Sequence, residues 1–518
     1  MPKEVMIDGM IFKGLPEEEQ KYWIKNTRPP GKDEVLNNDQ VLLCLQICLG
    51  KNICLLGPPG VGKTLTLNRA QHLMSILFPE KKFDRTATTG MASSHLDNGK
   101  TIFDLLKTGP DSCLSYLPQF REKLMSPRIR KIIEEMEILH IDEASMLSEQ
   151  AFNYLESAAR EIRKNRKFMG GIQVILSGDI FQLSVIPGSE GAGILRKKRI
   201  ELTSVLENLS GSFDVTMLTQ NMRSRDDTQH KALITALIQK CPIIRKRAIE
   251  LLQKNCYTSP LYLDDAITLS RETGMVILTP TNSSDDGRCN LYNQTLADRL
   301  RKDNPGGPIE IGTAKPLHTW ATLPTWVKNV LRDKGGLKIE EDSILSQKRF
   351  EVHLFLYPGE PIMLRKNTDE YKNGDKCEFI SLSPDGSYLT VRRYSDNAIL
   401  NITKCDLTSE FVSNIGFEAF PVIKDAAMTI HKAQGCTLES GVIFDPYKLC
   451  AFKKHAPRMT YVALSRTRSL KKFVMTEKME EDAMTSHEAQ EDIERLWSLD
   501  YMTDYPKITL EELNMAFV

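Results

Sequence analysis

The run GPPGVGKT at residues 57–64 constrains the fold more than any other part of this sequence, because an apolar segment lies directly in front of it. It matches the phosphate-binding loop pattern G-x-x-x-x-G-K-[ST], which occurs between a buried strand and a helix. Gly57, Gly60 and Gly62 allow the tight turn in which successive backbone N–H groups converge on a phosphate. The helix expected to begin near Lys63 adds the positive end of its dipole. The chain is therefore expected to bind a nucleoside triphosphate.

Side chains of the same loop supply the remaining phosphate and metal contacts. Lys63 is expected to reach the terminal phosphates, and the Thr64 hydroxyl is expected to hold Mg²⁺. The other residues of this segment that are expected to bind nucleotide are Pro58, Pro59, Val61 and Leu65. A triphosphate with Mg²⁺ is thus the expected cofactor.

Two further polar segments follow apolar runs, as the phosphate loop does. Asp142 and Glu143 end the run ILHI, and the stretch GDIFQL at residues 178–183 follows another apolar run. At the carboxyl end of a strand beside a phosphate loop, Asp142 is placed to hold Mg²⁺, partly through its water shell. Glu143 is placed to take a proton from the hydrolytic water. Gln182 is placed to sense the γ-phosphate.

Composition limits the classes of protein and of partner. The 518 residues are enough for two to four domains. Lys and Arg number 68, as do Asp and Glu, so any nucleic-acid site must be built from local patches. The 11 cysteines form no CxxC pair, which favours a reducing compartment without disulfides or a structural metal, and the histidines read as ordinary core or surface residues. No segment has the ~20 consecutive apolar residues of a membrane span.

Short apolar runs along the chain are typical of buried parallel strands. The runs in the first part of the chain and in a second alternating block are 53–56, 138–141, 174–176, 275–278, 441–444 and 473–475. Helical segments are expected between them. The pattern predicts two α/β blocks, each with a parallel sheet.

Residues 300–420 have a different texture, with frequent Pro and Gly and short alternating segments such as 388–394. This texture is typical of a small β-rich domain inserted into the second α/β block. Its basic side chains would let it hold a nucleic-acid strand or brace a duplex. They are Lys348, Arg349, Arg365, Lys366, Arg392 and Arg393.

The motifs occur in the order found in superfamily 1B DNA helicases of the petite-integration-frequency (Pif) type, which are related to the RecD-like motors. The sequence resembles this family over about residues 36–470. The additional matching segments are Asp39-Gln40, TATTGMASS at 86–94, Gly99-Lys100-Thr101 with Phe103, Asn221-Met222-Arg223, TPTN at 279–282, Asn373-Gly374, TIHKAQGCT at 429–437 and YVALSRTR at 461–468.

The resemblance implies roles for residues in these segments. Gln40 would read the adenine of ATP, Arg223 would contact the γ-phosphate, and Arg466 would act as an arginine finger. Gln434 and Gly435 would also bind nucleotide. The residues expected to contact nucleic acid are Thr88, Thr89, Gly90, Thr281, Asn282, His431 and Lys432, of which the last two are expected at the start of a helix.

The implied fold class is α/β, with two RecA-like parallel-sheet motor domains and a small β-rich, SH3-like insertion in the second. The boundaries are 1–35 for an N-terminal extension, 36–215 for the first motor domain with a small insertion near 96–132, 216–300 and 421–518 for the second motor domain, and 301–420 for the inserted domain.

The implied activity is that of an ATP-dependent DNA helicase that translocates 5′→3′ along single-stranded DNA and separates duplex, with ATP hydrolysis between the two RecA-like domains. ATP and Mg²⁺ are the implied cofactors. The implied partners are single-stranded DNA, tailed or forked duplex DNA and proteins of replication or recombination, without a membrane. An intracellular, reducing location is expected, nuclear or cytoplasmic (or a host replication site if the chain is viral), because no targeting segment is recognised.

Three other readings remain open. A superfamily 1 RNA helicase would carry similar motifs and is separated by comparing DNA and RNA substrates. A nucleotide-gated nucleic-acid-binding protein without unwinding is a second alternative. Such a protein would not need the full set of residues for hydrolysis, and their presence argues against this alternative. The residues are Lys63, Asp142, Glu143, Arg223 and Arg466. A small-molecule kinase accounts for the phosphate loop but not for the segments TIHKAQG and YVALSRTR.

Overall fold

The computed structural model confirms the predicted α/β class. It describes residues 9–29, 34–89, 92–93, 96, 99–106, 124–147, 149–183, 213–221, 227–281, 288–313, 315–316, 353–366, 368, 370–371, 375–408, 416–424, 427–435, 437–480, 482–499 and 502–517. Two compact units are present. The first comprises Met1–Leu251, Phe452–Arg468 and Glu481–Val518, and the second comprises Leu252–Ala451 and Ser469–Glu480. The domain boundaries given above stay predictions.

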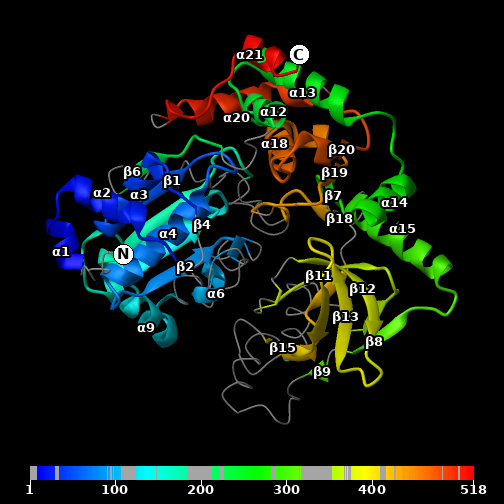
Figure 1. Cartoon of the computed structure of the whole chain (residues 1–518), viewed down its shortest axis with the longest axis horizontal. Coiled ribbons are helices and arrows are strands. Elements are labelled where there is room, and N and C mark those ends of the chain that lie inside the picture. The colour runs from blue at the N-terminus through cyan, green and yellow to red at the C-terminus, as the bar shows by residue number, and fades with distance from the viewer. Residues whose placement is uncertain are drawn as a thin grey trace. The chain divides into compact units, whose positions relative to one another are not determined.

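A six-stranded parallel sheet forms the centre of the first unit (Figure 1). In spatial order its strands are β3 (Lys100–Thr101), β2 (Phe83–Ala87), β4 (Ile138–Asp142), β5 (Gln173–Gly178), β1 (Ile53–Leu56) and β6 (Asp214–Met217). Every residue of β1, β4 and β5 is buried, as expected for a parallel sheet covered on both faces. Because all the strands are parallel, their carboxyl ends lie along one edge of the sheet.

Helices account for most of the other described residues of the first unit. They are α1 (Gly9–Gly14), α2 (Glu17–Asn26), α3 (Asn38–Cys48), α4 (Lys63–Leu77), α6 (Ile102–Leu105), α9 (Pro127–Glu135), α10 (Glu149–Ile162), α12 (Thr228–Ala236), α13 (Pro242–Cys256), α18 (Ala456–Ser465), α19 (Asp482–Thr485), α20 (His487–Trp497) and α21 (Leu510–Met515). About half of the small insertion predicted near 96–132, including residues 107–123, lies outside the described residues.

The N-terminal segment is part of the core of the first unit. Phe12 of α1 and Ile24 of α2 are fully buried in the hydrophobic cluster that also contains Leu67 and Leu73 of α4. Arg69 of α4 donates hydrogen bonds to the backbone carbonyls of Thr27 and Glu34, two residues that follow α2 in the sequence. Residues 9–14 and 17–26 are therefore helical and packed, although their sequence shows little periodicity.

A four-stranded parallel sheet forms the centre of the second unit. Its order is β18 (Ala427–Thr429), β7 (Val276–Thr279), β19 (Val442–Phe444) and β20 (Phe473–Met475). Two helices pack against it, α14 (Leu263–Thr273) and α15 (Arg288–Asp303). Buried Ile277 and Tyr292 belong to the cluster they share. The second α/β block predicted from the sequence is confirmed.

Between β7 and β18 the chain forms the predicted β-rich segment, with antiparallel strands. They are β8 (Ile309–Thr313), β9 (Lys315–Pro316), β10 (His353–Leu356), β11 (Pro361–Leu364), β12 (Lys376–Leu382), β13 (Tyr388–Arg393), β14 (Ile399–Thr403), β15 (Cys405–Thr408), β16 (Gly416–Ala419) and β17 (Val422–Lys424). The largest sheet has the order β14-β13-β12-β11-β17. Its buried side chains, Phe379 and Val391 among them, belong to a separate hydrophobic cluster. The SH3-like character of this segment stays a prediction.

Candidate functional site

The phosphate loop connects β1 to α4, as the sequence predicts. Gly57 and Gly62 both have positive φ, of 154° and 85°. A Cβ atom on Gly57 would collide with the carbonyl oxygen of Leu218, and one on Gly62 would lie 2.7 Å from Gln40 Nε2. Only glycine therefore fits at these two positions.

Lys63 is the first residue of α4, and its side chain lies over the loop. The ammonium group donates hydrogen bonds to the carbonyl oxygens of Gly57 (2.7 Å) and Pro58 (3.2 Å). Thr64 follows and is partly exposed. The first backbone N–H groups of α4 have no partners within the helix, so they are available to a bound phosphate.

Gln40 links the phosphate loop to the beginning of α3. Its Oε1 accepts a bond from the Asn37 N–H (3.0 Å), and its Nε2 donates to the Val61 carbonyl (3.3 Å). The Asn37 side chain returns a bond to the Gln40 N–H, which completes a capping box. Reading of adenine by Gln40 stays a prediction.

Asp142 ends β4, and neutral donors hold its carboxylate. Its Oδ1 accepts bonds from the Ser177 hydroxyl (2.6 Å) and from the Glu143 N–H (2.9 Å). His140 Nε2 lies 2.9 Å from the same hydroxyl. A serine hydroxyl has one proton, and Ser177 donates it to Asp142. His140 Nε2 must therefore carry a proton and donate it to the Ser177 oxygen. Burial lowers the pKa of His140 to about 4, so the imidazole is neutral at physiological pH.

Glu143 has a left-handed backbone, with φ of 51°, which is rare for a residue other than glycine. Two bonds to its carbonyl oxygen fix this conformation, from the Thr88 hydroxyl (2.8 Å) and the Met146 N–H (3.1 Å). The Thr88 N–H also donates to the Asp142 carbonyl (3.1 Å). Thr88 is therefore a direct neighbour of the acidic pair.

The segment after β5 brings Gln182 to the same edge of the sheet. Gln182 is only 2% exposed, and none of the described residues donates a hydrogen bond to its Oε1. A buried acceptor without a donor is costly, by about 1–3 kcal/mol. Its amide oxygen is thus suited to accept a hydrogen bond from a nucleophilic water, as expected of a γ-phosphate sensor.

ATP and Mg²⁺ fit this set of groups. Both hydrogen bonds that the described residues donate to the Asp142 carboxylate go to Oδ1, which leaves Oδ2 for a cation. The Thr64 hydroxyl and the Lys63 ammonium belong to the loop at the same sheet edge. Oxygen ligands are those that Mg²⁺ prefers. Among the described residues no group of three or more His, Cys, Asp or Glu has the geometry of a metal site.

Two further predicted nucleotide contacts come from Arg223 and Arg466. Arg466 directly follows α18 as its C-cap residue and is buried, and its guanidinium donates bonds to the Val462 carbonyl (3.0 Å) and the Ser465 hydroxyl (2.7 Å). Arg223 lies outside the described residues. Its near neighbour Asn221 donates a bond to the Pro59 carbonyl of the phosphate loop (3.3 Å).

In the second unit, predicted nucleic-acid residues follow two neighbouring strands, β7 and β18. The Thr279 hydroxyl donates to the Thr281 carbonyl (3.1 Å), which turns the chain after β7. His431 and Lys432 follow β18 and are partly exposed. The other predicted residues here are Gln434, which is buried, Gly435, which has a φ of 85°, and Asn282, which lies outside the described residues, as does Gly90 of the first unit.

The helix expected at residues 431–432 is wrong. The segment after β18 forms hydrogen-bonded turns instead. The Lys432 N–H bonds the Thr429 hydroxyl (3.3 Å), and Gly435 then takes a left-handed conformation. A hydroxyl at one end and a left-handed glycine at the other limit the segment to about one turn.

Several basic residues of the β-rich segment are paired within it. Arg393 forms ion pairs with Asp396 (2.6 Å) and Asp375 (3.2 Å). Arg392 pairs with Glu378 at 3.2 Å. These two arginines brace the sheet, whereas Lys366 is exposed. Lys348, Arg349 and the pair Asn373-Gly374 lie outside the described residues.

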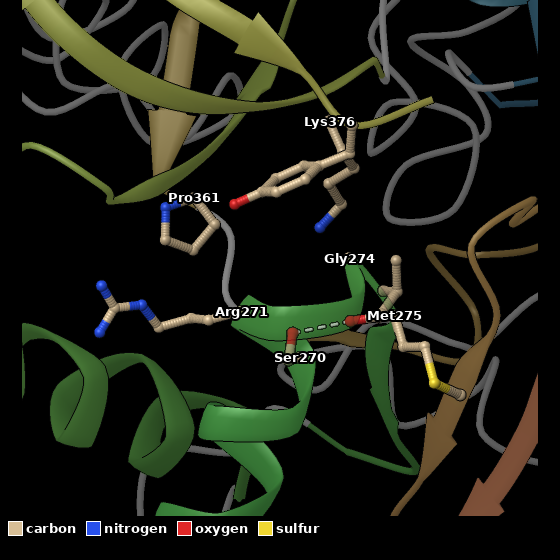
Figure 2. Close-up of a pocket in the computed structure, with 8 residues that line it drawn as sticks. Ser270, Arg271, Gly274, Met275, Pro361 and Lys376 are labelled. Atoms are coloured by element: carbon tan, nitrogen blue, oxygen red, sulfur yellow. Dashed lines mark hydrogen bonds between the residues drawn. The ribbon is translucent and has the colours of Figure 1, made fainter. Parts of the chain in front are cut away.

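A small pocket of the second unit lies where the β-rich segment meets α14 and β7 (Figure 2). It encloses ≈ 20 Å³ and is lined by Ser270, Arg271, Gly274, Met275, Val276, Pro361, Lys376 and Tyr394. The volume suits about one water molecule. The pocket is therefore too small for a nucleotide, and the carboxyl edge of the first sheet remains the candidate site.

Some residues of the site were not singled out from the sequence. Ser177 and His140 hold Asp142, and both are polar residues inside otherwise apolar strands. Such a residue is the signal to look for, because a buried polar group needs a partner. The bond from Thr88 to Glu143 has no comparable signal in the sequence.

No helix among the described residues is long and apolar enough to cross a membrane.

Known proteins resemble the chain in sequence. A sequence model of the PIF1-like helicase family matches residues 35–248. Human ATP-dependent DNA helicase PIF1 is 31% identical over 464 residues, which cover 88% of this chain and 63% of the human protein. Protein 030L of invertebrate iridescent virus 6 is 26% identical over 503 residues, which cover 86% of this chain and 91% of the viral protein. The chain thus spans less than two thirds of its human relative.

Solved structures share the fold. The Pif1 helicase of Candida albicans superposes with a TM-score of 0.65 at 19% identity, over 90% of this chain and 100% of that one. Bacteroides Pif1 bound to single-stranded DNA gives a TM-score of 0.58 at 19% identity, over 90% of this chain and 97% of that one. The matched family model, the sequence relatives and the solved structures with the same fold all make the chain similar to PIF1-like helicases.

Proposed function

We propose that the chain is an ATP-dependent DNA helicase that moves 5′→3′ along single-stranded DNA and separates duplex. The observation that carries this proposal is the carboxylate of Asp142, which neutral donors hold at the sheet edge that also bears the phosphate loop. Relatives named ATP-dependent DNA helicase and a structural relative bound to single-stranded DNA support the substrate class. The direction of movement follows from the family resemblance.

The residues of the first unit divide the work of hydrolysis. Lys63 and the N–H groups at the start of α4 bind the β- and γ-phosphates. Thr64 and Asp142 would hold Mg²⁺, which would supply positive charge to the transferring phosphoryl group. Glu143 takes the proton of the attacking water, and Gln182 orients that water through its buried amide oxygen. Arg223 and Arg466 stabilise the charge that develops in the transition state.

The second unit provides the contacts to the strand. Thr281, Asn282, His431 and Lys432 bind sugar and phosphate groups from loops that follow β7 and β18, as Thr88, Thr89 and Gly90 do in the first unit. Such contacts position a strand without reading its bases. Hydrolysis and strand binding therefore depend on different residues and can be separated by mutation.

Unwinding of matched duplexes tests the proposal. Duplexes with a 5′ tail, a 3′ tail or no tail are prepared in DNA and in RNA, and strand separation is followed with ATP and Mg²⁺. We expect separation of the 5′-tailed DNA duplex alone. Preference for RNA tails would establish the RNA-helicase alternative. DNA-stimulated hydrolysis without separation of any duplex would support a translocase or a binding protein instead.

Two variants identify the hydrolytic site. Lys63→Ala is expected to abolish hydrolysis while single-stranded DNA still binds. Glu143→Gln keeps the side-chain shape but loses the base, so it should bind ATP and strand yet turn over slowly. Normal DNA-stimulated turnover in Lys63→Ala would place hydrolysis elsewhere in the chain.

A further inference from the structure

The loop that carries Gln182 is held by side chains from far along the chain. Asp179 is fully buried, and its carboxylate accepts bonds from the hydroxyls of Tyr461 (2.6 Å) and Tyr505 (3.2 Å) and from the Phe181 N–H (3.0 Å). The two tyrosine hydroxyls also lie 3.2 Å apart. Burial raises the pKa of both tyrosines, so both remain protonated donors. A buried carboxylate requires such donors.

Arg458 holds the backbone of the same loop. Its guanidinium is buried and donates to three consecutive carbonyl oxygens, those of Ile180 (3.3 Å), Phe181 (3.3 Å) and Gln182. It also pairs with Asp492 of α20 at 3.2 Å. A guanidinium has five donors in a fixed plane, and here they fix the path of the loop.

The C-terminal segment encloses the apolar side chain of the loop. Phe181 is fully buried, with ring centroids 5.7 Å from Trp497 and 4.9 Å from Tyr505. Trp497 and Tyr505 contact each other edge to face at 5.9 Å. The indole N–H of Trp497 is anchored on the Ile238 carbonyl (2.8 Å). The loop is thus bound by hydrogen bonds on one side and aromatic packing on the other.

Helix α18 connects this brace to the predicted arginine finger. Arg458 and Tyr461 are three residues apart and lie on one face of α18, and Arg466 is the C-cap residue of this helix. A short helix is a rigid element, so the loop with Gln182 and the finger are held to one another through it. Neither Trp497 nor Tyr505 lies in any of the sequence motifs.

We propose that Asp492, Trp497 and Tyr505 together form a positioning element of the hydrolytic site, which fixes the loop that bears Gln182. This inference rests on the proposed function, because the role of Gln182 belongs to it. The other interpretation is that the segment only stabilises the fold. The two differ in whether the effect of a change at Tyr505 depends on Gln182.

Tyr505→Phe is the sharpest test, because it removes one hydroxyl and keeps the ring that packs on Phe181. Steady-state hydrolysis is measured in the full chain at saturating single-stranded DNA, together with thermal unfolding. We expect kcat to fall about 5-fold, with KM for ATP within about 2-fold, as for one hydrogen bond that positions a catalytic group. Tyr262→Phe, at a position 73% exposed, is the matched control and should change neither.

A double-mutant cycle with Gln182→Ala separates positioning from stability. If Tyr505 acts through Gln182, adding Tyr505→Phe to Gln182→Ala lowers kcat no further. An undiminished 5-fold loss in that background, a rise in KM without a fall in kcat, or unchanged kcat in the single variant would each overturn the inference. Absence of hydrolysis in the unmodified chain would instead refute the proposed function, and this inference with it.

Discussion

Asp142 and Asp445 occupy corresponding positions in the two sheets, but their surroundings differ. Asp142 is the last residue of β4 in the first unit, and Asp445 directly follows β19 in the second. Both strands are buried and belong to parallel sheets. Asp142 accepts bonds from a hydroxyl and a backbone N–H, both neutral. Asp445 is fully buried and pairs with the Arg288 guanidinium at 3.2 Å and with the Tyr292 hydroxyl at 2.9 Å.

The charge of the partner decides what each aspartate can do. An arginine already compensates the carboxylate of Asp445, so that group has no charge to offer to a cation. The neutral donors around Asp142 orient the carboxylate without cancelling its charge, which leaves it suited to a metal ion. An acid at the end of a buried strand is therefore insufficient evidence for a metal site until its partners are known.

The largest effect is expected for Asp142→Asn. The amide keeps the size of the side chain but removes the charge that would hold Mg²⁺. We expect ATP turnover to fall on the order of 10³-fold, since metal charge stabilisation contributes several kcal/mol to such a reaction. Initial rates at saturating ATP and single-stranded DNA measure the effect. A loss below tenfold would show that Asp142 is as structural as Asp445.

Asp445→Asn should affect stability instead. Removing one member of a buried ion pair costs about 3–5 kcal/mol, and partial exposure of Arg288 reduces this to about 2–3 kcal/mol here. Urea unfolding measures the loss, and turnover below the unfolding transition should change less than tenfold. If Asp445→Asn lost hydrolysis as severely as Asp142→Asn, the distinction between the two aspartates would fail.

The neutral imidazole of His140, which is hydrogen-bonded through Ser177 to Asp142, makes the stability of the first unit sensitive to acid. The pKa of His140 is about 4 in the folded state and near 6.5 when unfolded, so unfolding takes up a proton between these values. Stability from this group is complete above about pH 6.5 and is lost as the pH falls toward 4. Between pH 7 and pH 5 the loss should be about 2 kcal/mol.

His140→Gln is the control for this pH dependence. Its amide nitrogen can replace Nε2 as the donor to Ser177, and it does not titrate. The variant should therefore unfold with a flatter dependence on pH than the unmodified chain. Identical pH profiles for the two proteins, measured by urea unfolding, would rule out His140 as the responsible group.

The smallest expected effect is on the salt dependence of DNA binding by the β-rich segment. Here too a basic side chain that is paired with acids differs from one that is exposed. Arg393 is paired with two aspartates, whereas Lys366 is exposed. If Lys366 contacts DNA, Lys366→Gln should make the log–log salt slope of single-stranded DNA binding shallower by about 0.7. Arg393→Gln should leave the slope unchanged and destabilise the segment. Equal slopes for all three proteins would remove Lys366 from the strand-binding surface.

The sequence predicts the most buried strands of the two parallel sheets, because such strands are short apolar runs, but it does not single out β2, β3, β6 or β18. The strand predicted at 53–56 is β1, and the one predicted at 138–141 differs from β4 only by the added Asp142. The N-terminal helices α1 and α2 are less visible. Only a few of their residues, such as Phe12 and Ile24, enter the core, so the apolar periodicity is weak.

Candidate site residues were identifiable where one short segment carries the chemistry, as in the phosphate loop. Residues that act through long-range contacts were not. The pairing of Asp179 with Tyr505 joins positions 326 residues apart, and Tyr505 lies in no distinctive local pattern. The roles assigned to individual residues of the site stay predictions until variants are measured.

The left-handed backbone of Glu143 has a consequence for protein engineering. A residue with a Cβ atom pays about 1–2 kcal/mol to adopt this conformation, and glycine does not. Glu143→Gly would therefore relieve backbone strain while deleting the carboxylate. A library sorted only for heat resistance would enrich glycine at this position and recover well-folded, inactive proteins. Thermostable variants of this chain thus require a parallel sort for turnover.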